Sequence, residues 1–161
     1  MIYYTILNTP AGEMLLTSDG EAITGMHWTV FPRAPKVSLG WIESKAFFSG
    51  VIAQLDEYFA GKRQKFDFAI KFEGTPFQQS VWNELQKIPY GAHTSYQAIA
   101  ATIDRPKAVR AVGTAVGSNP LCIAVPCHRV LTSDQKLGGY AGGLDSKRTL
   151  LSTEKIAWKE A

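Results

Sequence analysis

The spacing of apolar residues along the chain changes near residue 44. Before that point, short apolar runs separated by turn residues are typical of β-strands. These runs cover residues 2–7, 14–17 and 22–28, and Asp19-Gly20 between the second and third predicts a hairpin. Residues 31–40 contain two prolines and are expected to form a loop.

From residue 44 to residue 60 the apolar residues recur at intervals of three and four, which predicts a helix that ends at Gly61. Residues 66–72 then alternate as one more strand would. The pattern changes again after this segment. We therefore predict an N-terminal α/β domain over residues 1–73, with a small antiparallel sheet and a helix, and a second, mostly helical domain over residues 74–161.

The second domain begins with strong helix signals. A capping box from Thr75 to Gln78, with proline at the first helical position, predicts a helix through residue 88. Ser95 is expected to cap a short helix to residue 103, and a tight turn leads to a third helix over residues 107–116. Two short helices joined by such a turn favour a helix-turn-helix motif.

The third helix is built almost entirely from small residues, and two interpretations fit it. Its small members are Ala108, Ala111, Gly113, Thr114, Ala115 and Gly117. Such a surface lacks the side chains that read base edges, but it allows close approach to a shallow nucleic-acid groove. A close crossing of two helices requires the same residues, and both interpretations stay open. Arg110 projects either into solvent or, as the sharper hypothesis, into the gap left by an extruded nucleotide.

A thiol stands beside an imidazole at Cys127-His128, directly after Pro126. The apolar run at residues 121–125 predicts a buried strand that this proline ends. A neighbouring histidine or positive field lowers the pKa of a cysteine and so populates the nucleophilic thiolate. Free cysteines are often inert core residues. The proline before Cys127 and the His-Arg pair after it favour a reactive thiol that faces a pocket.

Composition narrows the class of protein. The 161 residues are 45% hydrophobic and 19% charged, with a net charge of +3, which is typical of a globular protein and permits a polyanionic partner. We expect no membrane span and no secretory signal, and the two cysteines favour a reducing, cytoplasmic location. Cys122 is expected to pack as a small apolar side chain. Cys122, Cys127 and His128 lack a fourth ligand, so no metal site is predicted.

Five blocks, taken together and in this order, resemble the O6-alkylguanine-DNA alkyltransferase family. The blocks are residues 95–96 (SY), 110–113 with 119–120 (RAVG and NP), 126–130 (PCHRV), 139–144 (GYAGGL) and 150–154 (LLSTE). The resemblance is close in the second half of the chain and loose in the first. It implies a ribonuclease H-like N-terminal domain and a winged helix-turn-helix C-terminal domain.

The resemblance also implies a reaction and the residues that perform it. Such proteins transfer the alkyl group from O6 of guanine, and less readily from O4 of thymine, irreversibly to their own cysteine. Cys127 matches the acceptor, and His128 the residue that removes its proton through a water. Glu154 matches the carboxylate that orients the histidine, Tyr96 the hydroxyl that assists the departing guanine, and Asn119 the residue that braces the active-site turn.

The remaining implied sites concern DNA and the base. Arg110 matches the finger that replaces a flipped nucleotide, and Val130, Tyr140 and Ala141 match the walls of the base pocket. The other implied DNA contacts, mainly in the minor groove of the duplex, are Ser95, Lys107, Ala108, Ala111 and Gly113. No cofactor is implied, and we expect a monomer. The chain departs from the family at Gln135, where glycine is common, so that turn is expected to differ in shape.

Two other functions remain as hypotheses. One is a DNA-binding module without transfer chemistry, which uses the helix pair alone. The other is a Cys-His acyl-transfer enzyme, for which the small-residue helix has no evident purpose. Single residues have plainer alternatives too, because Tyr96 can serve only as packing and Glu154 as an exposed charge.

Overall fold

The computed structural model describes residues 1–160. Its N-terminal half contains a four-stranded sheet in the order β3-β2-β1-β4. The strands are β1 (Tyr3–Thr9), β2 (Gly12–Ser18), β3 (Ile23–Trp28) and β4 (Ile42–Glu43). The hairpin expected at Asp19-Gly20 joins β2 to β3. β1, β2 and β3 form the expected antiparallel sheet, and β4 departs from it. It pairs with β1 in parallel after residues 29–41 carry the chain back to the start of that strand.

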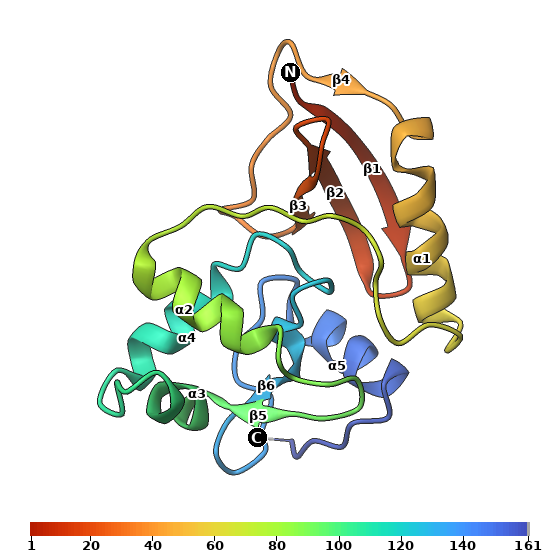
Figure 1. Ribbon diagram of the computed structural model, residues 1–161. Coiled ribbons are helices and arrows are strands. Elements are labelled where there is room, and N and C mark those ends of the chain that lie inside the picture. Colours follow the sequence, from red (N-terminus) through yellow and green to blue (C-terminus); the bar gives the residue numbers. More distant parts are fainter. Residues whose placement is uncertain (161) are drawn as a thin grey trace.

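The helix expected over residues 44–60 begins later than its apolar spacing indicates. A 3-10 turn, η1 (Ala46–Phe48), precedes α1 (Ser49–Phe59), which lies beside β1 in Figure 1. Val51, Leu55 and Tyr58 form its buried face. Gly61 follows with a φ of 76°, the left-handed conformation that glycine adopts readily at helix ends.

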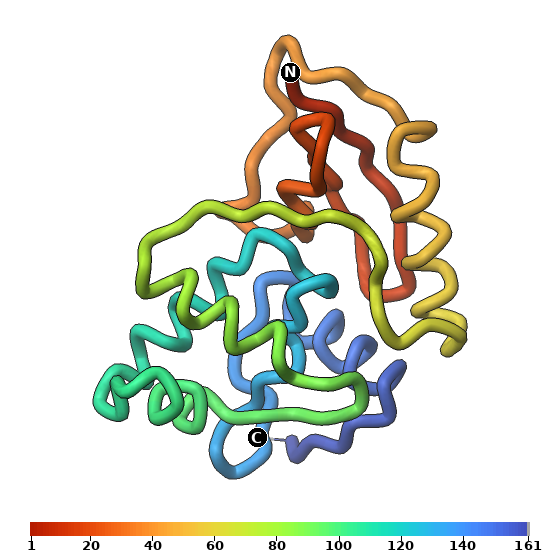
Figure 2. The backbone as a smooth tube through the Cα atoms, in the orientation of Figure 1, coloured from red at the N-terminus to blue at the C-terminus, as the bar shows by residue number. Residues whose placement is uncertain are grey.

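The strand predicted at residues 66–72 is absent, and this segment is an extended connector. Figure 2 shows it crossing between the two halves of the molecule. Its backbone pairs with the sheet at one bridge only, where the N–H of Ile23 donates to Ala69 and the N–H of Lys71 donates to Ile23. The alternate apolar side chains are half-buried against the core. Burial of one side, rather than a strand ladder, accounts for the alternation.

The second half contains helices and one small parallel pair of strands. Its elements are α2 (Pro76–Leu85), β5 (Thr94–Ser95), α3 (Tyr96–Thr102), α4 (Val109–Gly117), η2 (Cys127–Arg129), β6 (Val130–Leu131) and α5 (Leu144–Thr153). The capping box at Thr75 and the Ser95 cap are both present. α4 begins two residues later than predicted because the N–H of Ala108 closes a turn onto Arg105.

The apolar run at residues 121–125 is buried, but it is not the predicted strand. Leu121 forms a bridge with Met26 of β3, and Cys122 forms a bridge with Val125. Ile123 between them has a φ of 75°, a conformation that a β-branched residue rarely adopts. The segment is therefore a tight turn held against the edge of the N-terminal sheet. This contact joins the halves around one continuous hydrophobic core.

Candidate active site

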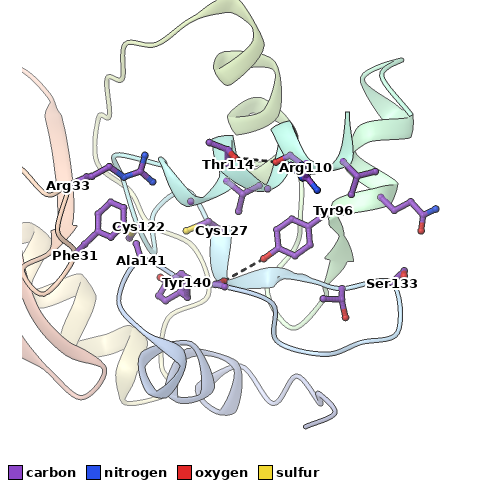
Figure 3. Close-up of a pocket in the computed structure, with 17 residues that line it drawn as sticks. Phe31, Arg33, Tyr96, Arg110, Thr114, Cys122, Cys127, Ser133, Tyr140 and Ala141 are labelled. Carbon is purple, nitrogen blue, oxygen red and sulfur yellow. Dashed lines mark hydrogen bonds between the residues drawn. The ribbon is translucent and has the colours of Figure 1, made fainter. Parts of the chain in front are cut away.

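A cavity of about 760 Å³ opens between α4, the turn η2 and the glycine-rich loop before α5. Figure 3 shows its lining, with the sulfur of Cys127 at the wall. The residues that line it are Phe31, Arg33, Tyr96, Gln97, Val109, Arg110, Gly113, Thr114, Val116, Gly117, Cys122, Cys127, Thr132, Ser133, Gly139, Tyr140 and Ala141. The cavity thus brings together the thiol, Arg110 and Tyr96, which are far apart in the sequence.

Asn119 fixes the turn that carries Cys127. Its side-chain amide donates to the carbonyl of Val125 at 2.7 Å, and its Oδ1 accepts the N–H of Leu121 at 3.0 Å. The N–H of Cys127 in turn donates to the same Val125 carbonyl at 2.8 Å. Asn119 is buried, so these bonds are shielded from competing water. The main chain on both sides of the thiol is consequently held in one conformation.

The surroundings of Cys127 favour its thiolate even though only 3% of the residue is exposed. The neighbouring thiol of Cys122 is the largest influence that lowers the pKa of Cys127. Burial opposes this effect, while Asn119 and the charge of Lys147 add to it. The cavity supplies access from one side. A buried but pocket-facing thiolate is a reactive arrangement, whereas a cysteine packed on all sides is inert.

His128 and Glu154 form a buried pair next to the thiol-bearing position. His128 Nε2 donates to Glu154 Oε2 at 2.5 Å, and both side chains are fully buried. Glu154 caps the end of α5, so it is not the exposed charge that its residue type would suggest. Burial alone would raise the pKa of its carboxyl, but the hydrogen bonds from His128, Arg129 and Tyr58 outweigh burial and lower that pKa to about 2.

The imidazole of His128 presents its second nitrogen as an acceptor. Burial lowers the pKa of His128, which favours the neutral ring. Because Nε2 donates to Glu154, the neutral tautomer leaves the lone pair on Nδ1. Within residues 1–160, Nδ1 is the buried side-chain nitrogen that lacks a hydrogen-bond partner. A buried base with an unused lone pair can accept a proton.

Tyr96 lines the cavity, and the buried side chain of Lys147 lies next to it. The Tyr96 hydroxyl donates to the carbonyl of Gly139 at 3.5 Å and accepts from Lys147 Nζ at 3.4 Å. Burial, with the negative charge of Cys127, raises the pKa of Tyr96 to about 12, so the phenol keeps its proton. Lys147 is buried and also donates to the carbonyls of Val130, Leu137 and Gly139. The amine therefore ties the walls of the cavity together.

Not every residue expected at the base pocket lines the cavity. Tyr140 and Ala141 do, and the Tyr140 hydroxyl accepts a hydrogen bond from Trp28 Nε1 at 3.1 Å. Val130 lies behind the wall, and its carbonyl already accepts from Lys147 at 2.7 Å.

The exposure of α4 bears on its two interpretations. Ala111, Thr114 and Arg110 are exposed and Gly113 is half-exposed, whereas the face packed in the core consists of Val112, Ala115 and Val116. Ala115 serves the helix crossing with α2, where its carbonyl accepts from Trp82 Nε1 at 2.9 Å. Of these small residues, Ala111 and Thr114 are exposed and thus available to an external partner.

Comparisons with known proteins decide the family. A family model described as 6-O-methylguanine DNA methyltransferase, ribonuclease-like domain, matches residues 2–72, and one for the DNA binding domain matches residues 76–156. The chain belongs to the 6-O-methylguanine DNA methyltransferase family. The fold class is therefore as the resemblance implied, with a ribonuclease-like and a DNA-binding part. Alkyl transfer in DNA repair is its activity, and DNA is its partner.

Relatives of this methyltransferase family cover nearly the whole chain. Methylated-DNA–protein-cysteine methyltransferases from Methanosarcina barkeri and Haemophilus influenzae are 44% and 43% identical, over 96% and 98% of this chain and 98% and 88% of their own. The crystal structure of Mycobacterium tuberculosis OGT in complex with DNA has a TM-score of 0.88 at 42% identity, and the match covers 95% of this chain and 92% of that one.

Several residues around the methyltransferase site escaped the sequence analysis. Phe31 and Arg33 come from a loop with no functional signal, yet they line the cavity. Tyr58 of α1 donates to Glu154 Oε2 at 2.6 Å, and helical spacing alone marks it as a core residue. Arg129 bonds both oxygens of the same carboxylate, and its place within the PCHRV block was the available signal. Lys147 gave no such signal, because the sequence does not distinguish a buried lysine from an exposed one.

Two further findings concern residues 1–160 only. No helix in this range is long and apolar enough to cross a membrane. No group of three or more His, Cys, Asp or Glu side chains in this range is arranged to hold a metal ion.

Ser95 and Lys107, which were expected at the DNA, lie outside the cavity. The Ser95 hydroxyl accepts the N–H of Ala98 at 3.0 Å as the cap of α3, and Lys107 is exposed.

Proposed function

We propose that Cys127 is the residue of this methyltransferase that accepts the alkyl group. Its lowered pKa, its place on the cavity wall and the rigid turn set by Asn119 support this role. The thiolate sulfur attacks the alkyl carbon on O6 of guanine, a carbon–sulfur bond forms, and the carbon–oxygen bond breaks. The electron pair of the broken bond passes into the guanine. The thioether product is stable, so each chain reacts once.

His128 receives the proton that Cys127 loses. Its Nδ1 lone pair is buried and unpartnered, and a water molecule between the two residues would carry the proton. Glu154 fixes the tautomer through its bond to Nε2 and stabilises the imidazolium that forms. His128 thus removes the thiol proton, and Glu154 orients His128.

Tyr96 assists the departing guanine. Its phenol remains protonated because its pKa is raised to about 12, and it lies on the cavity wall where the base would sit. A hydrogen bond from this hydroxyl offsets the negative charge that builds on the guanine ring. Tyr140 and Ala141 form the facing wall, and Val130, whose carbonyl Lys147 holds, supports that wall from behind.

The DNA approaches α4 through its minor groove, and the target base leaves the stack. The exposed Ala111 and the half-exposed Gly113 permit close contact with the groove. Lys107 and Ala108 lie at the corner between α3 and α4, and Ser95 lies at the start of α3. Arg110 is exposed at the cavity mouth, where it can fill the space of the extruded nucleotide. Residues 74–161 thus bind the DNA, while residues 1–73 support the active site through Trp28 and Tyr58.

The thiol at the cavity wall carries this proposal, and mass spectrometry tests it. Incubation with duplex DNA that contains O6-methylguanine should add one methyl group to each chain, located at Cys127 by fragmentation. Cys127→Ser should still bind the DNA but gain no methyl group. Cys122→Ser is the matched control, because it removes the neighbouring thiol and should still be methylated. A wild-type chain that binds DNA without gaining mass would leave only a binding module.

The role of Arg110 needs a substrate comparison. Arg110→Ala should slow transfer from duplex DNA at every flanking sequence, because an empty gap no longer holds the base outside the stack. Transfer from a free O6-benzylguanine base requires no extrusion and should be unchanged. Gln97→Ala, a change at another lining residue of the cavity, is the control. Equal slowing on the duplex and on the free base would contradict the finger role.

A further inference from the structure

A second thiol stands beside the acceptor. Only four residues separate Cys122 from Cys127, and the left-handed backbone at Ile123 turns the chain back so that Cys122 bridges Val125. The N–H of Cys127 donates to the Val125 carbonyl at 2.8 Å, which brings the second cysteine back to the first. Both residues are free thiols, both are buried, and both line the same cavity.

The two sulfur atoms interact. The Cys122 thiol is the largest influence on the lowered pKa of Cys127, and Figure 3 shows the sulfur of Cys127 directed towards Cys122. The same contact and burial raise the pKa of Cys122 well above its usual value, so Cys122 keeps its proton while Cys127 loses it. One sulfur is therefore a nucleophile, and its neighbour is a protonated thiol held in place by Asn119, whose carbonyl lies 3.8 Å from the Cys122 sulfur.

We propose that Cys122 is the resolving thiol of a reversible disulfide with Cys127, formed when a hydroperoxide oxidises the acceptor. The Cys127 thiolate attacks the terminal oxygen of the peroxide and becomes a sulfenic acid, while the peroxide is reduced and leaves as hydroxide or alkoxide. Cys122 then attacks the sulfenic sulfur, the sulfur–sulfur bond forms, and the sulfenic oxygen leaves as water with the Cys122 proton. A thiol reductant returns both cysteines.

The cavity makes this chemistry accessible and useful. It is large enough for a nucleobase, so a peroxide reaches the thiolate without any rearrangement. A smaller cavity of about 120 Å³ also adjoins Cys122 from the side of Trp28. Without a neighbouring thiol, excess peroxide converts a sulfenic acid to sulfinic acid, which thiols do not reduce. A disulfide stops that oxidation, and its short loop adds little stability, so it is readily reduced again.

Mass spectrometry measures the disulfide without any alkyl transfer. Trypsin cleaves after Arg110 and Arg129, so both cysteines lie in the fragment 111–129. The whole protein is treated with excess hydrogen peroxide, the remaining thiols are blocked, and this fragment is weighed. We expect the wild-type fragment to be lighter by two hydrogens and to return to its original mass with dithiothreitol. In Cys122→Ser and Cys122→Ala we expect Cys127 to form a sulfenic acid first, which dimedone labels. At later times we expect the fragment to gain two oxygens, because Cys127 becomes a sulfinic acid.

Activity supplies the second measurement, each protein being compared with its own untreated sample. The peroxide-treated wild type should regain most of its methyl transfer after dithiothreitol, and the two Cys122 variants should regain little. Sulfinic acid in the wild type to the same extent as in the variants would overturn the proposal. The consequence for repair rests on the proposed acceptor role of Cys127. The mass of the fragment tests the disulfide independently of that role. A disulfide in a protein that never accepts a methyl group would refute only the proposed acceptor role of Cys127.

Discussion

Tyr58→Phe tests how far the N-terminal half controls the chemistry. The Tyr58 hydroxyl donates to Glu154 Oε2 at 2.6 Å, and both side chains are buried. Glu154 in turn holds His128 by a 2.5 Å bond. Phenylalanine keeps the ring and its packing against Phe59 and Phe66 but removes the donor. The change therefore isolates one hydrogen bond between α1 and the candidate base.

The structure sets the size of the effect. A hydrogen bond to a charged group contributes about 1.5–3 kcal/mol. His128 and Arg129 still donate to Glu154 Oε2 after the change, so the carboxylate is not left unpaired. The lower part of the range then applies, and we expect the free energy of unfolding to fall by about 2 kcal/mol. A less well oriented His128–Glu154 pair that raises the activation free energy of transfer by about 1.4 kcal/mol would slow methyl transfer about tenfold.

Urea unfolding and single-turnover methyl transfer measure the two effects separately. Tyr90→Phe is the matched control, because its hydroxyl donates to the neutral carbonyl of Thr153 at 3.2 Å and is only half-buried. We expect it to cost about 0.5–1 kcal/mol of stability and to leave the transfer rate and its pH profile unchanged. A shifted pH profile in Tyr58→Phe alone would mark it as a positioning residue. Equal transfer rates for Tyr58→Phe and the wild type would refute that reasoning.

Two further predictions follow from the same region. Gly138→Ala should slow transfer and cost about 1 kcal/mol or more, measured by urea unfolding, because Gly138 has a φ of 69° and an added Cβ would lie 2.9 Å from the Tyr96 hydroxyl oxygen. Gly50→Ala, in open space within α1, should instead be neutral or stabilising. The Glu154 pKa is lowered from 4.5 to about 2, so its contribution of about 3 kcal/mol is complete above pH 4.5 and is lost as the pH falls through 2. Urea unfolding at several pH values should show that loss in the wild type and not in Glu154→Gln.

Local signals in the sequence predicted what depends on local physics. The capping box at Thr75 and the cap at Ser95 form their hydrogen bonds within one helical turn, so the local sequence motif locates both helix starts. The resemblance around Cys127 located the candidate nucleophile for a similar reason, since the turn that presents it is held largely by residues 119–127. Such features do not depend on the rest of the fold.

Contacts between distant segments could not be predicted in this way. Tyr58 and Glu154 are 96 positions apart, and each looks ordinary among its neighbours. The alternation in residues 66–72 and the apolar run at residues 121–125 both suggested strands, yet each forms only isolated bridges. In both segments burial against the other half of the molecule selects the apolar positions. The pattern therefore reports which side chains are buried and leaves the backbone conformation undetermined.

Gln135 shows how a departure from a family pattern is accommodated. The residue has a φ of 66°, the left-handed conformation that glycine adopts readily and that costs a side chain about 1 kcal/mol. Its amide donates to the carbonyl of Ala157 at 2.9 Å, and its own carbonyl accepts the N–H of Lys159 at 2.8 Å. Glycine could form only the second bond. The hydrogen bond of the side chain therefore offsets the strain of its backbone and fastens the chain after α5 to this turn, beside the cavity residues Thr132 and Ser133.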